Sequence, residues 1–176
     1  MHCSSFSKHL APGYRVGWVA AGRFATAVQR LKLMTPLSAA TPSQQALSEY
    51  LAQGGYDRHL RQLRRSLAQQ QATALAAVAR HFPPGTRVAQ PEGGYFLWVE
   101  LPPQIDALQL HRQALQQGIS LAPGQIFSAD RRFANCVRIN YGHPAQSRFE
   151  AALATVGALA SAMAREPSAP TKLSKQ

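Results

Sequence analysis

The sequence predicts an α/β protein, because long segments of helical periodicity alternate with short segments of strand character. Its 176 residues are 45% hydrophobic, a fraction typical of packed globular chains, which excludes a disordered or collagen-like chain over most of the length. Apolar runs are too short for a membrane span, so no contact with a membrane is expected. Cys3 and Cys136 lie far apart and form neither a disulfide framework nor a metal or redox pair, which favours a reducing, cytoplasmic compartment.

The first part of the chain is expected to hold one strand and two helices. Pro12-Gly13 marks a turn before the strand, and apolar residues at helical spacing mark the first helix. Thr41 is the expected N-cap of the second helix, where Gln44 would complete a capping box, and Gly54-Gly55 ends that helix. The expected elements are a strand over 15–20, a helix over 23–34 and a helix from Thr41 to the glycine pair.

The longest expected element is a helix from Asp57 to Phe82, in which apolar residues repeat at helical spacing until Pro83-Pro84-Gly85. Such a rod is longer than a small domain is wide, so we expect it to link two bodies. Beyond this helix the pattern is mixed. The expected strands are 87–89, 95–101, 119–122 and 136–141, and the expected helices are 107–117 and 144–163.

The formal net charge of +11 arises from a shortage of acids, with 8 Asp+Glu against 19 Lys+Arg. The densest basic cluster interleaves with leucines at helical spacing, which is typical of a solvated helix face opposite a packed one. The alternative is a surface that binds nucleic-acid phosphates, and it predicts tight, salt-sensitive DNA binding. The cluster consists of Arg58, Arg61, Arg64 and Arg65.

Several kinds of chemistry find no suitable set of residues. The acidic residues never group and no two histidines share a ligand spacing, so neither a carboxylate-pair hydrolase nor a metal site is expected. Ser5-x-x-Lys8 matches the nucleophile motif of penicillin-binding proteins. The Ser-Asp-Asn and Lys-Thr-Gly elements which that chemistry also requires do not occur in the sequence.

Lys8 stands among groups that suit a phosphate. Ser5 and Ser7 supply hydroxyls, and Arg15 supplies a guanidinium that the Pro12-Gly13 turn can fold back beside them. Hydroxyls together with a planar, permanently charged guanidinium make a cradle for a phosphate dianion. A lysine beside such a cradle favours a phosphorylated aldehyde cofactor, while the alternative is a surface lysine in a polar loop.

The run SSFSKHLAPGYRVGW, residues 4–18, resembles the pyridoxal-phosphate lysine motif of fold-type I aminotransferases. It is most similar to the aminotransferase-like domain fused to GntR-type winged-helix regulators, the MocR subfamily. Two later segments agree in order and spacing: PEGGYFLW at 91–98 resembles the Gly-Gly-aromatic strand, and VRINYG at 137–142 resembles the substrate-carboxylate strand. The resemblance covers about residues 1–163, and it departs at His9, where many relatives have threonine after the lysine.

The resemblance implies the PLP-dependent transferase fold of type I and pyridoxal 5'-phosphate as the cofactor. Lys8 would carry this cofactor covalently and act as the catalytic residue. Ser5 and Arg15 would hold its phosphate, and Ser7 belongs to the same predicted cradle.

The resemblance implies that Arg138 binds the substrate α-carboxylate, with Asn140 nearby as a further substrate-binding residue. In a strand the two share one face, opposite Val137 and Ile139, and a guanidinium suits bidentate capture of a carboxylate. The alternative for Arg138 is a structural salt bridge with an acid. Gly94, which permits close approach of the backbone to a ligand, and Tyr95 are further candidates for substrate binding, whereas Trp98 is expected in the core.

The resemblance also divides the chain into the end of the PLP-binding large domain (1–55), a linking helix (56–82), a small domain (83–164) and a disordered tail (165–176). Family members place a cofactor-binding acid, and in the regulators a winged helix, before the lysine motif. We therefore expect the chain to be the C-terminal part of a longer homodimeric protein, and to bind the cofactor weakly and without transaminase activity by itself.

The three motifs leave two functions open for the intact protein. The first is a GntR/MocR-type transcriptional regulator that senses an amino acid or amine together with the cofactor, and binds DNA only through its winged helix. The alternative is a stand-alone class I/II aminotransferase that transfers an amino group between an amino acid and a 2-oxo acid. A winged helix encoded upstream would distinguish them, because enzyme and sensor share all three motifs.

Overall fold

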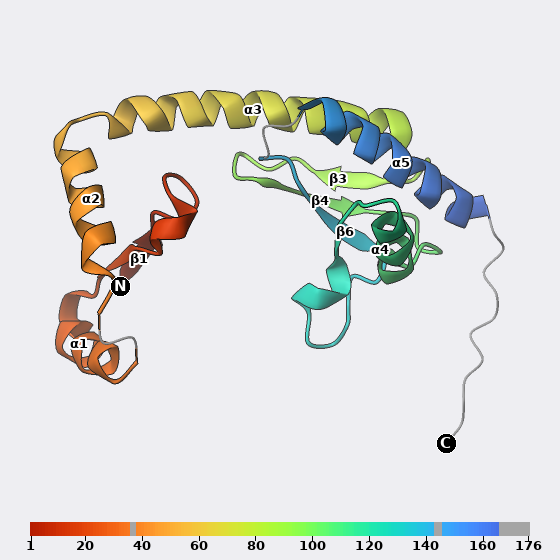
Figure 1. Cartoon of the computed structure of the whole chain (residues 1–176). Coiled ribbons are helices and arrows are strands. Elements are labelled where there is room, and N and C mark those ends of the chain that lie inside the picture. Colours follow the sequence, from red (N-terminus) through yellow and green to blue (C-terminus); the bar gives the residue numbers. More distant parts are fainter. Residues whose placement is uncertain (36–37, 143–145, 166–176) are drawn as a thin grey trace, which may run out of the picture. The chain divides into compact units, whose positions relative to one another are not determined.

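The computed structural model describes residues 1–35, 38–142 and 146–165, and these fall into two compact units, Met1–Arg64 and Arg65–Gln176 (Figure 1). The expected tail lies outside the described residues, apart from Arg165, which ends the last helix. Within the described ranges, no helix combines the length and the apolarity that crossing a membrane requires.

An antiparallel hairpin forms the start of the first unit. Strand β1 (His2–Ser5) pairs with β2 (Gly17–Ala20), so that Ser5 lies opposite Gly17. The sequence pattern does not indicate β1, because its His-Cys-Ser-Ser run lacks the β-branched and aromatic residues typical of strands. The second strand begins two residues later than expected, since Arg15 adopts a left-handed conformation (φ 53°) after the short helix η1 (Pro12–Tyr14).

The helices of the first unit confirm the expected positions. Helix α1 (Ala25–Met34) follows the single turn η2 (Gly22–Phe24), and α2 (Thr41–Ala52) ends before Gly54, whose φ is 73°. The predicted capping box is wrong. Thr41 is already helical, no side chain caps the helix, and the Gln44 side-chain amide instead donates to the Ala39 carbonyl at 2.9 Å.

Helix α3 (Tyr56–His81) confirms the long helix to within one residue at each end, and the second unit continues from its C-terminal part. There a sheet of four described strands has the order β3-β4-β6-β5 with every pair antiparallel. The strands are β3 (Arg87–Ala89), β4 (Phe96–Glu100), β5 (Ala122–Pro123) and β6 (Cys136–Asn140). The strand expected over 119–122 is mostly wrong, because pairing with β6 begins only at Ala122.

The core of the second unit lies between one face of this sheet and three helices. Leu97 and Val99 of β4 and Val137 and Ile139 of β6 point into it, each at most 4% exposed. The helices that cover it are α3, α4 (Ala107–Gln116) and α5 (Gln146–Arg165), and the short helix η3 (Gly124–Phe127) follows β5. The start expected for the last helix, Pro144, lies outside the described residues. Each fully buried aliphatic side chain stabilises the fold by about 1.5–3 kcal/mol.

Gly157 sets how closely α5 approaches the end of α3. A β-carbon at this position would collide with the backbone carbonyl of His81. A backbone carbonyl cannot rotate away as a flexible side chain can. Two helices therefore meet at a point where only glycine fits.

We expect the Gly157→Ala substitution to lower the free energy of unfolding by about 1–3 kcal/mol, as overpacking does. Helix propensity alone predicts the opposite sign, since alanine is better than glycine in an open helix by about 1 kcal/mol. Urea denaturation of the two proteins measures the difference. A more stable alanine variant would contradict the close contact between α5 and His81.

Candidate functional site

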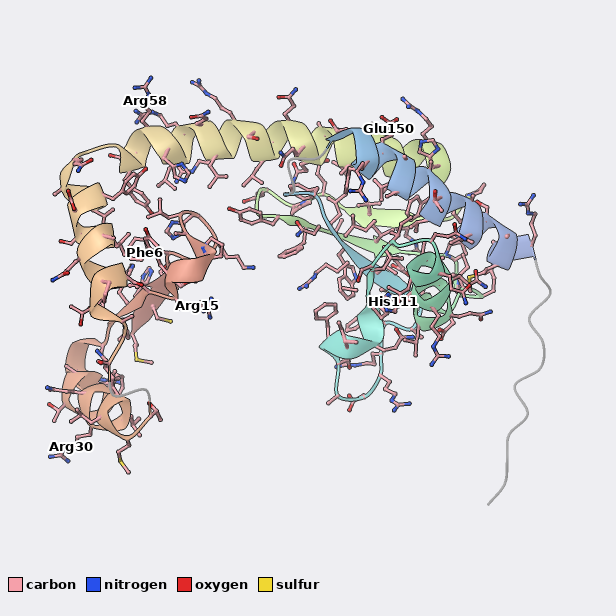
Figure 2. All side chains as sticks on the ribbon, viewed as in Figure 1. Phe6, Arg15, Arg30, Arg58, His111 and Glu150 are labelled. Atoms are coloured by element: carbon pink, nitrogen blue, oxygen red, sulfur yellow. The ribbon has the colours of Figure 1, made fainter. Side chains whose placement is uncertain are left out.

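The first group of candidate residues lies in the turn between β1 and β2. Arg15 Nη1 donates a hydrogen bond to Ser7 Oγ at 3.1 Å, and the Ser7 backbone N–H donates to Ser5 Oγ at 3.1 Å. Lys8 directly follows Ser7 and is exposed. Arg15 thus folds back onto the hydroxyls in the way the Pro12-Gly13 turn permits, and Figure 2 shows its side chain on this hairpin.

Backbone contacts close the turn around Lys8. The Phe6 N–H donates to the Val16 carbonyl at 3.0 Å, and the Phe6 carbonyl accepts from the N–H groups of Leu10 and Ala11, each at 3.0 Å. At the other strand, a β-carbon on Gly17 would lie 2.8 Å from the Ser4 carbonyl, so the two strands meet where one of them has no side chain. The residues on both sides of Lys8 are therefore held by the hairpin.

The donor set of this turn fits a phosphate dianion. Two hydroxyls and a guanidinium are linked by hydrogen bonds, and Ser5 and Arg15 are exposed to an incoming ligand. A phosphate dianion carries the charge opposite to that of the guanidinium, and a planar guanidinium can donate two parallel hydrogen bonds to it, which a serine hydroxyl cannot accept. In the part of the chain that the structure describes, no three metal-ligating side chains gather.

Arg138 lies on β6 in the second unit and is held by aromatic rings. Its guanidinium carbon is 4.2 Å from the ring centroid of Phe96 and 4.5 Å from that of Phe127. The expected alternation is confirmed, since Val137 and Ile139 are buried while Arg138 is half-buried on the other face. Among the described residues no carboxylate pairs with Arg138, so cation–π contacts replace the salt bridge that was the alternative.

Trp98 contradicts the prediction of a core position. Antiparallel pairing places it opposite Arg138, on the face that the core does not use. It is half-buried there and meets Phe127 and Phe133 edge-on, with ring centroids 5.7 Å and 5.4 Å away. Because Leu97 takes the inward position on β4, the pleat sends Trp98 to the opposite face.

The other substrate-binding candidates meet near the end of β6. The Tyr141 N–H donates to the Tyr95 carbonyl at 2.9 Å, and the Tyr141 hydroxyl donates to the Gly94 carbonyl at 3.0 Å. Asn140 Oδ1 accepts from the Gly142 N–H at 3.0 Å. The Tyr95 ring covers Gly142 so closely that a β-carbon there would collide with it, and burial raises the pKa of the Tyr95 hydroxyl.

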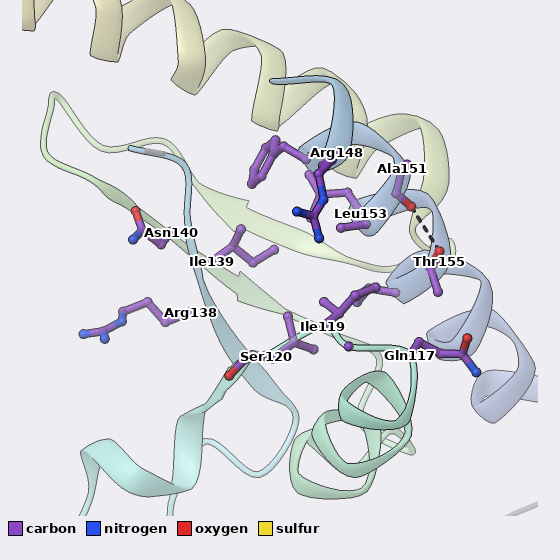
Figure 3. A pocket seen from close by; sticks show the side chains of 15 residues that line it. Gln117, Ile119, Ser120, Arg138, Ile139, Asn140, Arg148, Ala151, Leu153 and Thr155 are labelled. Atoms are coloured by element: carbon purple, nitrogen blue, oxygen red, sulfur yellow. Dashed lines mark hydrogen bonds between the residues drawn. The ribbon is translucent and has the colours of Figure 1, made fainter. Parts of the chain in front are cut away.

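Arg138 and Asn140 also line a cavity of about 750 Å³ (Figure 3). Its other walls come from residues 117–121 and from the first part of α5, where Arg148 supplies a second cation. The cavity exists because residues 119–121 are not part of the sheet, so the edge of β6 opposite β4 has no paired strand beyond Arg138. Its lining combines apolar side chains of β6 and α5 with the Arg148 guanidinium, whereas the Arg138 guanidinium points to the other side of β6 (Figure 3).

Four side chains that contact the Lys8 turn or Arg138 were not identified from the sequence. Phe96 and Phe127 hold Arg138, and Tyr56 and His59 contact the turn at His9. The partners of His9 are 47 and 50 positions away in the sequence, so no local spacing indicates them. Phe96 carries a weaker signal, because it is an aromatic residue within the strand predicted over 95–101, whereas no predicted element includes Phe127.

Comparison with known proteins shows that the chain is similar to aminotransferases. The family model described as "Aminotransferase class I and II" matches residues 1–154. The chain is 45% identical to the HTH-type transcriptional regulator YdcR of Escherichia coli over 159 residues, which are 90% of this chain and 34% of that protein. It is 32% identical to aromatic-amino-acid aminotransferase 1 of Thermococcus litoralis, over 80% of this chain and 34% of that protein.

Solved structures agree with these sequence relatives. Kynurenine aminotransferase of Pyrococcus horikoshii superposes with a TM-score of 0.85 at 27% identity, over 93% of this chain and 41% of that one. LysN, the α-aminoadipate aminotransferase of Thermus thermophilus, superposes with a TM-score of 0.85 at 28% identity. The superposition covers 92% of this chain and 42% of LysN. The fold is thus that of the PLP-dependent fold-type I aminotransferases. The chain spans about a third of the length of the curated relatives it matches.

The Tyr141→Phe substitution tests the hydrogen bonds at the end of β6. Tyr141 is 2% exposed, and its hydroxyl also accepts from Gln71 Nε2 at 3.3 Å, so we expect a loss of about 1 kcal/mol in the free energy of unfolding. Tyr14, which is 44% exposed, is the matched control, and Tyr14→Phe should change stability by less than about 0.5 kcal/mol. Equal effects in urea denaturation would contradict a structural role for the Tyr141 hydroxyl.

Proposed function

Because the chain belongs to the class I and II aminotransferase family, we propose that it supplies the cofactor lysine and the carboxylate-binding arginine of a pyridoxal-phosphate domain. Membership of the family implies pyridoxal 5'-phosphate as the cofactor. The observation that carries the proposal is the chain of hydrogen bonds from Arg15 through Ser7 to Ser5, directly beside Lys8. These hydrogen bonds place the anion-binding residues in the same turn as the amine of Lys8.

In this proposal Lys8 is the catalytic residue, and Ser5, Ser7 and Arg15 bind the phosphate of the cofactor. The cofactor, when bound, supplies an aldehyde for an amine and a ring that accepts electrons. The Lys8 Nζ would hold the cofactor and, as a free amine, would move a proton at the α-carbon of the ligand. Arg15 and the two hydroxyls would hold the phosphate of the cofactor in the same turn that bears Lys8.

Arg138 binds the α-carboxylate of the amino-acid ligand, with Asn140 beside it. The rings of Phe96 and Phe127 contact the guanidinium and restrict its position without using its N–H groups in an ion pair, which leaves those groups for a carboxylate. Gly94 and Tyr95, joined to the end of β6 through Tyr141, complete the substrate-binding set.

For the intact protein we favour a GntR/MocR-type regulator that senses an amino acid or amine in the cytoplasm. The support is the likeness to YdcR at 45% and to YjiR at 37% identity, both named as HTH-type transcriptional regulators. The intact protein would be a homodimer that binds DNA through a winged helix preceding this chain. Residues 1–55 would then end the large domain, 56–82 would form the linking helix, and 83–164 would form the small domain.

A stand-alone aminotransferase is the second candidate, supported by the 32% identity to the enzyme of Thermococcus litoralis. The reading frame upstream of this chain distinguishes the two functions. A helix-turn-helix there supports the regulator, and an aminotransferase domain that begins directly supports the enzyme.

Reductive labelling tests the role of Lys8. In excess pyridoxal phosphate and borohydride, we expect the label to collect at Lys8 in clear preference to Lys32, an exposed lysine on α1 that serves as an internal control. Peptide mass spectrometry measures the ratio of the two labels. Arg15→Ala should lower this ratio about 10-fold or more, because bonds to a charged phosphate contribute about 1.5–3 kcal/mol.

Pyridoxal without its phosphate is the matched control for the cradle. It should label Lys8 and Lys32 at similar rates and should not respond to Arg15→Ala. Equal labelling of the two lysines by pyridoxal phosphate in the unchanged chain would refute the assignment of Lys8.

Arg138→Lys tests the carboxylate site in the longer protein that carries this chain. The variant keeps the positive charge but loses the planar fork, so the amino-acid concentration that shifts the absorbance of the bound cofactor should rise about 10- to 100-fold. The corresponding amine, which lacks the carboxylate, should be unaffected. Equal shifts for amino acid and amine would show that Arg138 does not bind the carboxylate.

A further inference from the structure

The turn that bears Lys8 is attached to the first turn of α3 through the next residue, His9. His59 Nε2 lies 2.7 Å from the His9 carbonyl oxygen, and the Tyr56 hydroxyl lies 2.9 Å from His9 Nδ1. A carbonyl oxygen only accepts hydrogen bonds, so His59 carries its proton on Nε2 and donates it. One residue is thus held twice, by its backbone and by its ring.

Aromatic packing surrounds these two hydrogen bonds. The rings of Phe6, His9 and Tyr56 meet edge-on, with centroids 5.5 Å, 5.8 Å and 6.4 Å apart. All three residues are half-buried, and burial, followed by the neighbouring Asp57 carboxylate, raises the pKa of the Tyr56 hydroxyl. The phenol is protonated near neutral pH, so it can donate to the imidazole Nδ1.

Lys8 lies between two anchored positions. On one side Phe6 belongs to the ring cluster, and its carbonyl closes the turn by accepting from Leu10 and Ala11. On the other side His9 is bound to α3. The backbone that carries Lys8 is therefore fixed at both ends, although its side chain is exposed. His9 stands where many relatives have threonine, and a threonine has no ring for this cluster.

We propose that Tyr56 and His59 are positioning residues that direct Lys8 toward its cofactor by holding the ring and the carbonyl of His9. The inference rests on the proposed function of Lys8. Fixing the backbone of the turn reduces the orientations open to the lysine stem, which raises the effective concentration of its amine beside a cofactor bound at the phosphate cradle. In this proposal the two residues act through His9, which both of them contact.

The test compares the ratio of label at Lys8 to label at Lys32 in the whole chain after reduction with pyridoxal phosphate. Tyr56→Phe and His59→Ala should each lower the ratio about 3- to 10-fold, the effect of losing one hydrogen bond. His59→Gln should restore most of the ratio, because a glutamine amide can donate to the same carbonyl. Tyr50→Phe, on α2 in the same unit, is the matched control and should leave the ratio unchanged.

A purely structural role predicts a different result. In that case Tyr56→Phe and His59→Ala would each unfold at a lower temperature than the unsubstituted chain. The ratio of label at Lys8 to label at Lys32 in the folded variants would equal that of the unsubstituted chain. This outcome overturns the positioning role and leaves the assignment of Lys8 intact. A parent chain with equal labels at Lys8 and Lys32 overturns both, and a lowered ratio that glutamine restores supports both.

Discussion

The register of antiparallel strands is the constraint on which both groups of candidate residues depend. Pairing of Ser5 with Gly17 closes the hairpin whose turn carries Lys8, and a side chain at Gly17 would push the strands apart. Pairing of Trp98 with Arg138 sets the aromatic face on which the guanidinium lies. A shift by one residue would turn Arg138 toward the core and bury an unpaired charge, so the hydrophobic pattern of β4 and β6 also protects the site.

The shortage of acidic residues affects the two candidate arginines, Arg15 and Arg138, because neither forms one of the ion pairs seen among the described residues. Among the described residues, ion pairs form at Arg80–Glu150 (2.8 Å) and Arg132–Asp130 (3.7 Å), both exposed, and neither includes a candidate residue. Arg15 is held by a hydroxyl and Arg138 by two rings. Neither contact neutralises the cation, so both guanidinium groups keep their charge for an anionic ligand. A carboxylate partner would have to be displaced before a phosphate or a substrate carboxylate could bind.

Local patterns predict the helices well and the strands less well. The 26 residues of α3 repeat their apolar positions over many turns, whereas β1 and β5 are short strands that form because a partner strand lies beside them. The prediction for Trp98 is wrong for the same reason, because strand pairing and not residue type sets its position. Its large side chain favours burial, but the pleat of β4 places it on the face of the sheet opposite the core. The capping box at Thr41 is wrong because the helix begins one residue earlier than that box requires.

By itself the sequence determined the order and chemistry of the motifs: a lysine among hydroxyls and a guanidinium, and an arginine on the polar face of an alternating strand. These are properties of near neighbours, which periodicity and spacing report. Only the tertiary structure decided that Phe96 and Phe127 enclose Arg138, and that Tyr56 and His59 hold His9. Such contacts join residues as many as 50 positions apart, and they depend on how separate elements pack, which no local pattern records.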